Sequence, residues 1–192
     1  MTNAVMAVDL AARYSALCVV DAGGTVVYEA NSKDQTSVQL INNIIFTIEI
    51  HSPSIVLIED VPYGISSQAM VKPVLRLQGM LIHALISGKY EDKALFVNPS
   101  TWQKTYPGVA RGKKEEREAA ARQHALDLGY TPPSLVQNHI DSLPEGAKVL
   151  KKNTNPLAKI ETDHIDAYLM AHWGQKYADE LAGMSGVQPI FI

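Results

Sequence analysis

The chain has 192 residues with 46% hydrophobic and 19% charged side chains, 12 glycines and 10 prolines. This composition indicates one soluble domain and excludes disordered, collagen-like and disulfide-bonded classes. The formal charge of −3, from 17 basic and 20 acidic residues, argues against a uniformly basic nucleic-acid binder. The charge is unevenly distributed, however, because the segment 104–159 holds ten basic and six acidic residues. That segment could face an anionic partner.

Short apolar runs separated by turns alternate with helical patterns along the chain. Strands are predicted at 4–9, 14–21, 25–30, 54–58 and 94–97. Helices are predicted at 36–50, 67–86, 113–128 and 163–181. A hairpin followed by alternating strands and helices predicts an α/β fold, a mixed sheet with an antiparallel hairpin, parallel strands and helices on both faces.

No composition shift divides the chain, so residues 1–192 are predicted to form one domain. Its least regular part is the segment 131–160, which holds four prolines and several lysines without periodicity. We expect this segment to be an irregular basic insertion, because long loops in compact domains are usually functional or mobile.

Three features point to a cytoplasmic protein. The N-terminus lacks a signal-peptide pattern, since its apolar stretch has no basic start and contains Asp9. No apolar run approaches the roughly 18 residues needed to cross a bilayer, so no membrane partner is expected. The single cysteine, Cys18, lies within an apolar run, which predicts a free buried thiol in a reducing compartment.

Four acidic residues stand apart from those that a solvated surface explains. Asp9 and Glu59 each end an apolar strand. Asp163 and Asp166 are three residues apart at the predicted start of the last helix, so they share one face. Four neighbouring carboxylates would repel one another unless cations neutralise them, and two Mg²⁺ ions about 3.5–4 Å apart can promote phosphodiester displacement. Singly, each acid could instead form a turn or complement a helix dipole.

This pattern resembles the RuvC-like Holliday junction resolvases of the RNase H-like superfamily. The resemblance rests on Asp9 closing the first strand, Glu59 closing the strand after the first helix, and the sequence Asp-His-Ile-Asp at 163–166. It implies an RNase H-like fold and a structure-selective endodeoxyribonuclease that resolves four-way DNA junctions as a homodimer, with two Mg²⁺ or Mn²⁺ ions per active site. In the family's arrangement Asp9 would bridge the ions, Glu59 and Asp166 would complete the sites, and Asp163 or His164 would assist.

Residues near these acids are further candidates for the site. Asp60 follows Glu59 directly, and successive strand side chains point to opposite faces, so Glu59 is the predicted ligand. The resemblance suggests that Tyr63 stacks on an unpaired base; packing against the sheet edge is the alternative. Lys113 and Lys114 are candidates to assist catalysis, although a solvated helix face also explains them. Candidate phosphate contacts are Lys104, Arg111, Lys113, Lys114, Lys151 and Lys152.

The sequence also departs from the family. Leu10-Ala11-Ala12-Arg13 replaces the glycine-rich turn commonly found after the first aspartate. With the long 131–160 insertion, this is typical of a phage or otherwise distant branch, whose product would act in the host cytoplasm. Two alternatives stay open: a related RNase H-like nuclease acting on RNA–DNA hybrids or general branched DNA, and a non-catalytic nucleic-acid-binding domain of the same fold. The apolar helix at 67–86 could form a dimer interface or be buried within one subunit.

Overall fold

A mixed sheet forms the centre of the molecule. The computed structural model describes residues 4–11, 15–21, 24–29, 36–61, 68–131 and 156–182. Within these ranges the strands are β1 (Val5–Asp9), β2 (Ala16–Asp21), β3 (Gly24–Glu29), β4 (Ile55–Glu59) and β5 (Ala94–Val97), in the spatial order β3-β2-β1-β4-β5. β2 is antiparallel to β1 and to β3, whereas β1, β4 and β5 are parallel. The predicted mixed sheet is confirmed.

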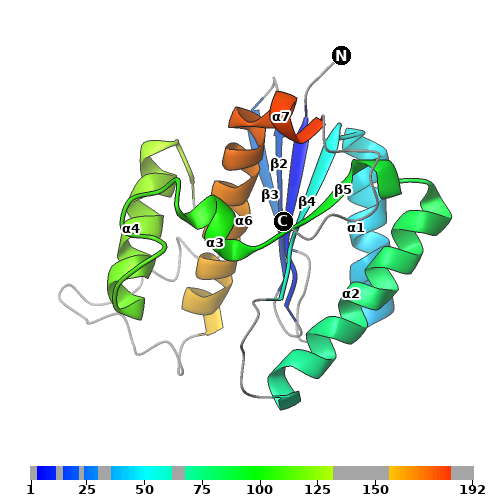
Figure 1. The fold of residues 1–192 in the computed structure, drawn as a ribbon, viewed down its shortest axis with the longest axis horizontal. Helices are drawn as coiled ribbons and strands as arrows, with labels where there is room; N and C mark the ends of the chain where they lie inside the picture. Colours follow the sequence, from blue (N-terminus) through cyan, green and yellow to red (C-terminus); the bar gives the residue numbers. More distant parts are fainter. Residues whose placement is uncertain are drawn as a thin grey trace.

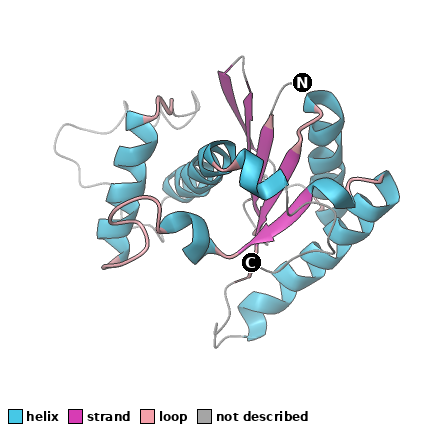
Figure 2. Cartoon of the chain, turned by 45° about the horizontal axis from the view of Figure 1, so that its top comes forward, coloured by secondary structure: helices cyan, strands magenta, loops and turns pink. Residues whose placement is uncertain are grey.

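Helices cover both faces of this sheet, as predicted. The described helices are α1 (Ser37–His51), α2 (Gln68–Gly88), α3 (Pro99–Gln103), α4 (Lys114–Asp127), α6 (Pro156–Lys176) and α7 (Ala178–Ala182), with a 3₁₀ turn at Glu91–Lys93. α1 and α2 lie on one face, and α6 crosses the other, with α4 on the outer side of α6 (Figures 1 and 2). No helix among the described residues is long and apolar enough to span a membrane.

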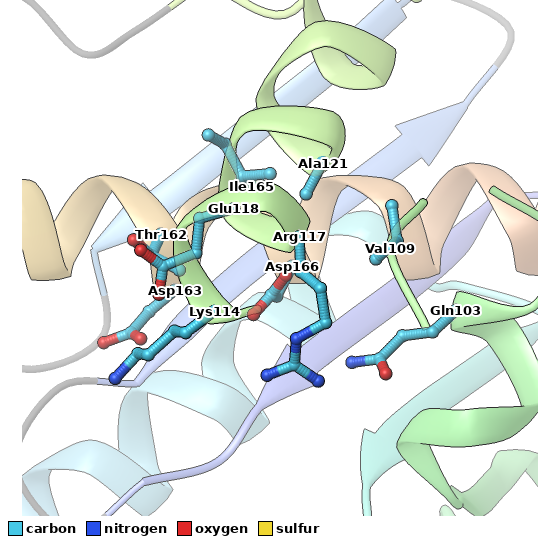
Figure 3. A pocket seen from close by; sticks show the side chains of 10 residues that line it. All are labelled: Gln103, Val109, Lys114, Arg117, Glu118, Ala121, Thr162, Asp163, Ile165 and Asp166. Atoms are coloured by element: carbon cyan, nitrogen blue, oxygen red, sulfur yellow. The ribbon is translucent and has the colours of Figure 1, made fainter. Parts of the chain in front are cut away.

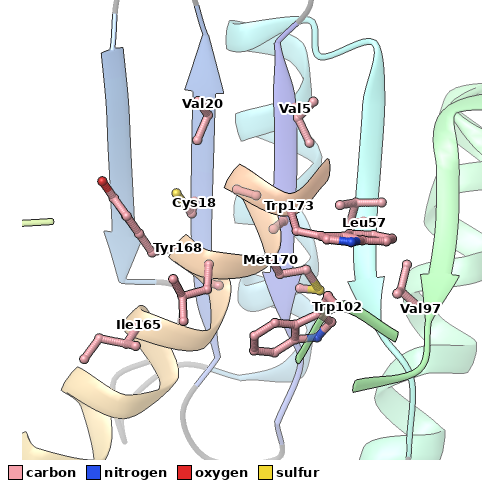
Figure 4. Close-up of a cluster of buried hydrophobic side chains, with 14 of the residues drawn as sticks. Val5, Cys18, Val20, Leu57, Val97, Trp102, Ile165, Tyr168, Met170 and Trp173 are labelled. Atoms are coloured by element: carbon pink, nitrogen blue, oxygen red, sulfur yellow. The ribbon is translucent and has the colours of Figure 1, made fainter. Parts of the chain in front are cut away.

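The strands are apolar on both faces because helices bury both sides of the sheet. Alternate residues such as Val5, Leu57 and Val97 pack against Met170 and Trp173 of α6 (Figure 4). The residues between them pack against α1 and α2. Cys18 belongs to the α6 side and is free and fully buried, as predicted, and burial raises the pKa of its thiol.

One glycine sets how closely α6 approaches the sheet. At Gly174 a Cβ atom would overlap Cδ1 of Leu57 and lie 2.9 Å from Cγ1 of Val5. Any larger residue would therefore push the helix away from β1 and β4. Since α6 also carries Asp163 and Asp166, this contact helps to place both acids relative to the strand ends.

Two boundary predictions and one prediction about a buried face were wrong. α6 begins at Pro156 rather than at residue 163, so the last part of the predicted 131–160 irregular insertion is helical. A proline is well suited to the first position of a helix, whose N–H would be unsatisfied anyway, and here it starts a helix within what composition indicated was a loop. The predicted helix at 163–181 is divided at Tyr177 into α6 and α7. The apolar face predicted for α1 included Val38, which is 57% exposed.

Candidate active site

The parallel register places Asp9 and Glu59 side by side. Val8 pairs with Ile58, so the next residues, Asp9 and Glu59, end β1 and β4 at the same level. Each lies two positions after a residue that packs under α6, namely Ala7 and Leu57 respectively. Because strand side chains alternate between faces, both carboxylates belong to the face that α6 covers.

Asp60 belongs to the opposite face, as predicted. Its Oδ1 accepts hydrogen bonds from the backbone N–H of Val61 at 2.8 Å and from Nε2 of Gln78, in α2, at 3.3 Å. These bonds hold the Asp60 side chain among the helices that cover the other side of the sheet, away from Glu59.

The α6 acids lie on the same side of the sheet as Glu59. Asp163 and Asp166 are partly buried and lie in the second and third turns of α6, which begins at Pro156. A helix dipole stabilises acids only in the first turn. The alternative that Asp163 and Asp166 merely complement the helix dipole therefore does not explain their positions. Both raise the pKa of Glu59 through charge repulsion, which indicates that the three carboxylates are near neighbours.

Glu59 is in an environment that disfavours its charge. Its pKa is raised from 4.5 to about 8, mainly by burial and secondly by repulsion from Asp166. The indole of Trp102 lowers the pKa, and repulsion from Asp163 raises it by a smaller amount. Its Oε2 is enclosed and has no hydrogen-bond partner among the described residues. Without a cation, the carboxyl is therefore largely protonated at neutral pH.

The four predicted acids do not form a completed metal site. Among the described residues, no three carboxylate, imidazole or thiol side chains are grouped so that they could hold one ion. The backbone brings Asp9, Glu59, Asp163 and Asp166 to one region, but side-chain movement would be needed before they could share an ion.

His164 differs from the neighbouring acids. It is 1% exposed, and neither ring nitrogen has a hydrogen-bond partner within the described part of the chain. Burial lowers its pKa to about 4, so the ring is neutral at pH 7. Adjacent helix residues lie about 100° apart around the axis. His164 therefore lies on a different face of α6 from Asp163.

A pocket of about 230 Å³ lies beside the α6 acids (Figure 3). It is lined by residues of α3, α4, α6 and the segment that joins α3 to α4. Its lining residues are Gln103, Val109, Lys114, Arg117, Glu118, Ala121, Thr162, Asp163, Ile165 and Asp166. Of the predicted basic residues, Lys114 therefore lies with the acids. Arg117 was not predicted, although its position one helical turn after Lys114 was a usable signal.

The other predicted DNA contacts are more scattered. Lys104, Arg111 and Lys113 are exposed and do not line this pocket. Lys113 precedes α4, and its backbone N–H donates to Oε2 of Glu116 at 3.1 Å. Acidic residues at 115 and 116 occupy the first turn, which offsets the unfavourable effect of lysines at this helix end. Tyr63, Lys151 and Lys152 lie outside the described residues.

The fold was compared with known proteins. No protein-family model matches the chain, and no curated protein sequence matches it. A solved structure of Thermus thermophilus RuvC in complex with a Holliday junction substrate is similar, with a TM-score of 0.56 and 16% identity over 93% of this chain and 96% of that one. The chain has the RuvC fold.

The match with a second Thermus thermophilus RuvC structure covers 90% of this chain and 97% of that chain, with 16% identity and a TM-score of 0.49. The sheet topology and the match with a TM-score of 0.56 confirm the RNase H-like α/β architecture predicted from the strand and helix order. In the RuvC fold of this chain, the parallel strands β1 and β4 end together beneath α6. That arrangement brings together acids more than a hundred residues apart in the sequence.

Proposed function

We propose that this protein is a metal-dependent endonuclease that resolves four-way DNA junctions by phosphodiester hydrolysis. The observation that carries the proposal is the position of Asp9 and Glu59 at matching strand ends, on the face where α6 presents Asp163 and Asp166. Similarity to a RuvC solved with a Holliday junction substrate supports the choice of substrate.

The donor set fits a hard divalent cation. Carboxylate oxygens are the preferred ligands of Mg²⁺ and Mn²⁺, and Glu59 has an enclosed oxygen without a hydrogen-bond partner in the described residues. A bound cation would offset the burial and repulsion that raise the pKa of this group. Asp9, Glu59, Asp163 and Asp166 would hold two ions per site after their side chains moved closer together.

The protein's own groups would bind and orient the DNA strand. Two such ions, when bound, lower the pKa of water and stabilise the negative charge that develops on a phosphodiester during hydrolysis. Lys114 and Arg117 lie at the pocket beside Asp166, where they could bind backbone phosphates. The exposed Lys104, Arg111 and Lys113 would add salt-dependent affinity without reading bases.

Symmetric cleavage of a junction would require two active sites, so we also propose a homodimer. α2 leaves Leu75, Met80 and Ile86 between 38% and 55% exposed, although its other side is buried in the core. Exposed apolar side chains on one helix suit an interface between copies. Gel filtration at micromolar concentration should give a dimer; a monomer would contradict paired nicking.

The first test is a comparison of substrates. Purified protein is incubated with a four-way junction, a linear duplex and an RNA–DNA hybrid, each with Mg²⁺, with Mn²⁺ and with EDTA. We expect paired nicks only in the junction and only with a divalent ion, because the water that hydrolyses the phosphodiester requires metal activation. The nicks are mapped on denaturing gels with each strand labelled in turn.

The other outcomes identify the alternatives. Cleavage of the hybrid alone would overturn junction resolution in favour of a different RNase H-like nuclease. Binding without cleavage in either metal would indicate a non-catalytic nucleic-acid-binding domain. Equal cleavage of junction and duplex would contradict structure selectivity.

A further inference from the structure

The indole N–H of Trp102 is a buried donor without a partner. The side chain is 0% exposed, and its Nε1 has no hydrogen-bond partner among the described residues. A buried tryptophan usually finds an acceptor for its N–H, because an enclosed donor is costly to leave unpaired. Leucine or phenylalanine would fill an apolar core without that cost, so the N–H at this position points to a specific acceptor.

The sheet register places this indole beside the end of β4. Glu59 pairs with Val97, the last residue of β5, and α3 begins after one further residue. Trp102 is the fourth residue of α3 and belongs to the same buried cluster as Leu57, on the side of the sheet that α6 covers. Figure 4 shows its indole beneath Met170 at the lower end of the sheet, with the nitrogen on the side of β4.

Glu59 supplies the matching acceptor. Its Oε2 is enclosed and has no hydrogen-bond partner in the described part of the chain, so one region of the core holds an unpaired donor and an unpaired acceptor. Burial and repulsion from Asp166 raise the pKa of Glu59, whereas hydrogen bonding by the Trp102 indole lowers it. The two groups are therefore close enough to interact. We expect rotation of the side chains to complete the bond, since buried polar atoms rarely stay unpaired.

A hydrogen bond at Oε2 would fix the direction in which Glu59 faces the other acids. An outer donor that holds one oxygen of a metal-binding carboxylate orients the other oxygen toward the ion. The indole is a donor without charge, so it orients the carboxylate without neutralising it, as a lysine or an arginine would. Because Trp102 belongs to α3, this anchor is independent of the α6 helix that carries Asp163 and Asp166.

We propose that Trp102 is a positioning residue for Glu59, its indole N–H donating to Oε2 and thereby turning the other carboxylate oxygen toward the site of the divalent ion. The part that concerns the ion rests on the proposed function, whereas the hydrogen bond does not. Trp102 acts only through Glu59, because its enclosed side chain is not accessible to DNA.

The hydrogen bond is tested in EDTA by the proton–nitrogen resonances of the indoles. The chain has two tryptophans, so either Trp102→Phe or Trp173→Phe assigns the Trp102 signal. Glu59→Gln keeps an acceptor oxygen, whereas Glu59→Met keeps the length of the side chain but offers only a weak sulfur acceptor. We expect the Trp102 indole proton to move upfield in Glu59→Met and to stay near its parental position in Glu59→Gln. The same position in both variants would overturn the proposal.

The positioning role is tested by the metal requirement of nicking. We expect Trp102→Phe to raise the Mg²⁺ concentration for half-maximal junction nicking about tenfold. Saturating Mg²⁺ should restore most of the rate, because the variant keeps all the carboxylates. A lower rate at every Mg²⁺ concentration, with an unchanged half-maximal concentration, would overturn the positioning role.

The matched control is Trp173→Phe, which removes the same atoms from the same buried cluster. Trp173 lies near the C-terminal end of α6, with its ring centroid 5.7 Å from that of Tyr177. Its replacement should leave the Mg²⁺ requirement unchanged. An equal rise in both variants would assign Trp102 a packing role alone and overturn the proposal.

The two readouts separate this proposal from the nuclease. An upfield shift in Glu59→Met, in a protein that nicks nothing, would support the hydrogen bond and contradict the nuclease. Metal-dependent nicking by the parent, with an unmoved Trp102 signal in Glu59→Met, would support the nuclease and contradict the positioning role.

Discussion

Replacing Glu59 with glutamine is expected to reduce junction nicking by at least about 100-fold. The amide keeps the size and the burial of the side chain but removes the negative charge that a divalent ion requires. Asp9→Asn should have a comparable effect, because Asp9 lies at the same level on the adjacent strand. Single-turnover nicking rates with saturating enzyme would measure the loss without a contribution from weaker DNA binding.

The same Glu59→Gln variant should be more stable than the parent in EDTA. The pKa of Glu59 is raised from 4.5 to about 8, so between these values the folded protein binds more protons than the unfolded chain. Stability must then fall as the pH rises through that window. We expect the parent to lose on the order of 2 kcal/mol between about pH 5 and pH 8, since partial exposure screens some of the penalty.

In the glutamine variant the free energy of unfolding should not fall in this way as the pH rises. Denaturant unfolding at a series of pH values would measure it for both proteins. Mg²⁺ should stabilise the parent at the alkaline end of the range, because it binds the ionised carboxylates of the folded state. It should have less effect on the variant. A parent whose stability is flat across the window would contradict the unfavourable environment assigned to Glu59.

Asp60→Asn is the matched control for both measurements. Asp60 is adjacent in sequence, but it hydrogen-bonds to Gln78 and Val61 on the opposite face. Asparagine retains the acceptor oxygen for both bonds. This variant should nick at the parental rate; a loss as large as that of Glu59→Gln would contradict the assignment of the active face.

Gly174→Ala is expected to destabilise the protein by about 1–3 kcal/mol. Its Cβ would overlap Leu57 and lie too close to Val5, and both side chains are fully buried in the packed core. We expect α6 to move away from the sheet, which would also displace Asp163 and Asp166 from Glu59. Chemical denaturation would measure the stability, and nicking should be impaired even where the variant is still folded.

Gly79→Ala provides the comparison, because it is the same substitution in another helix. Gly79 is exposed within α2, and an added Cβ would meet nothing within 4 Å. Alanine should therefore stabilise the protein by up to about 1 kcal/mol through helix propensity. Equal effects of the two substitutions would show that the close approach of α6 at Gly174 is not a constraint on the fold.

Local chemistry was enough to predict most of the architecture. Apolar runs of five or six residues and helical periodicity identify the strands and the main helices, because each signal lies within a few neighbouring residues. Alternation along β4 was also enough to separate Glu59 from Asp60. The start of α6 could not be found in this way, because Pro156 reads as a loop residue unless the helix that follows is already known.

The sequence by itself determined the fold class and named Asp9, Glu59, Asp163 and Asp166 as a set. Only the tertiary structure decided that β1 and β4 end in register beneath α6, that His164 is enclosed, and that Arg117 shares a pocket with the α6 acids. The physical reason is that charge repulsion, burial and unsatisfied donors depend on distances between residues far apart in the chain, and sequence periodicity describes only near neighbours.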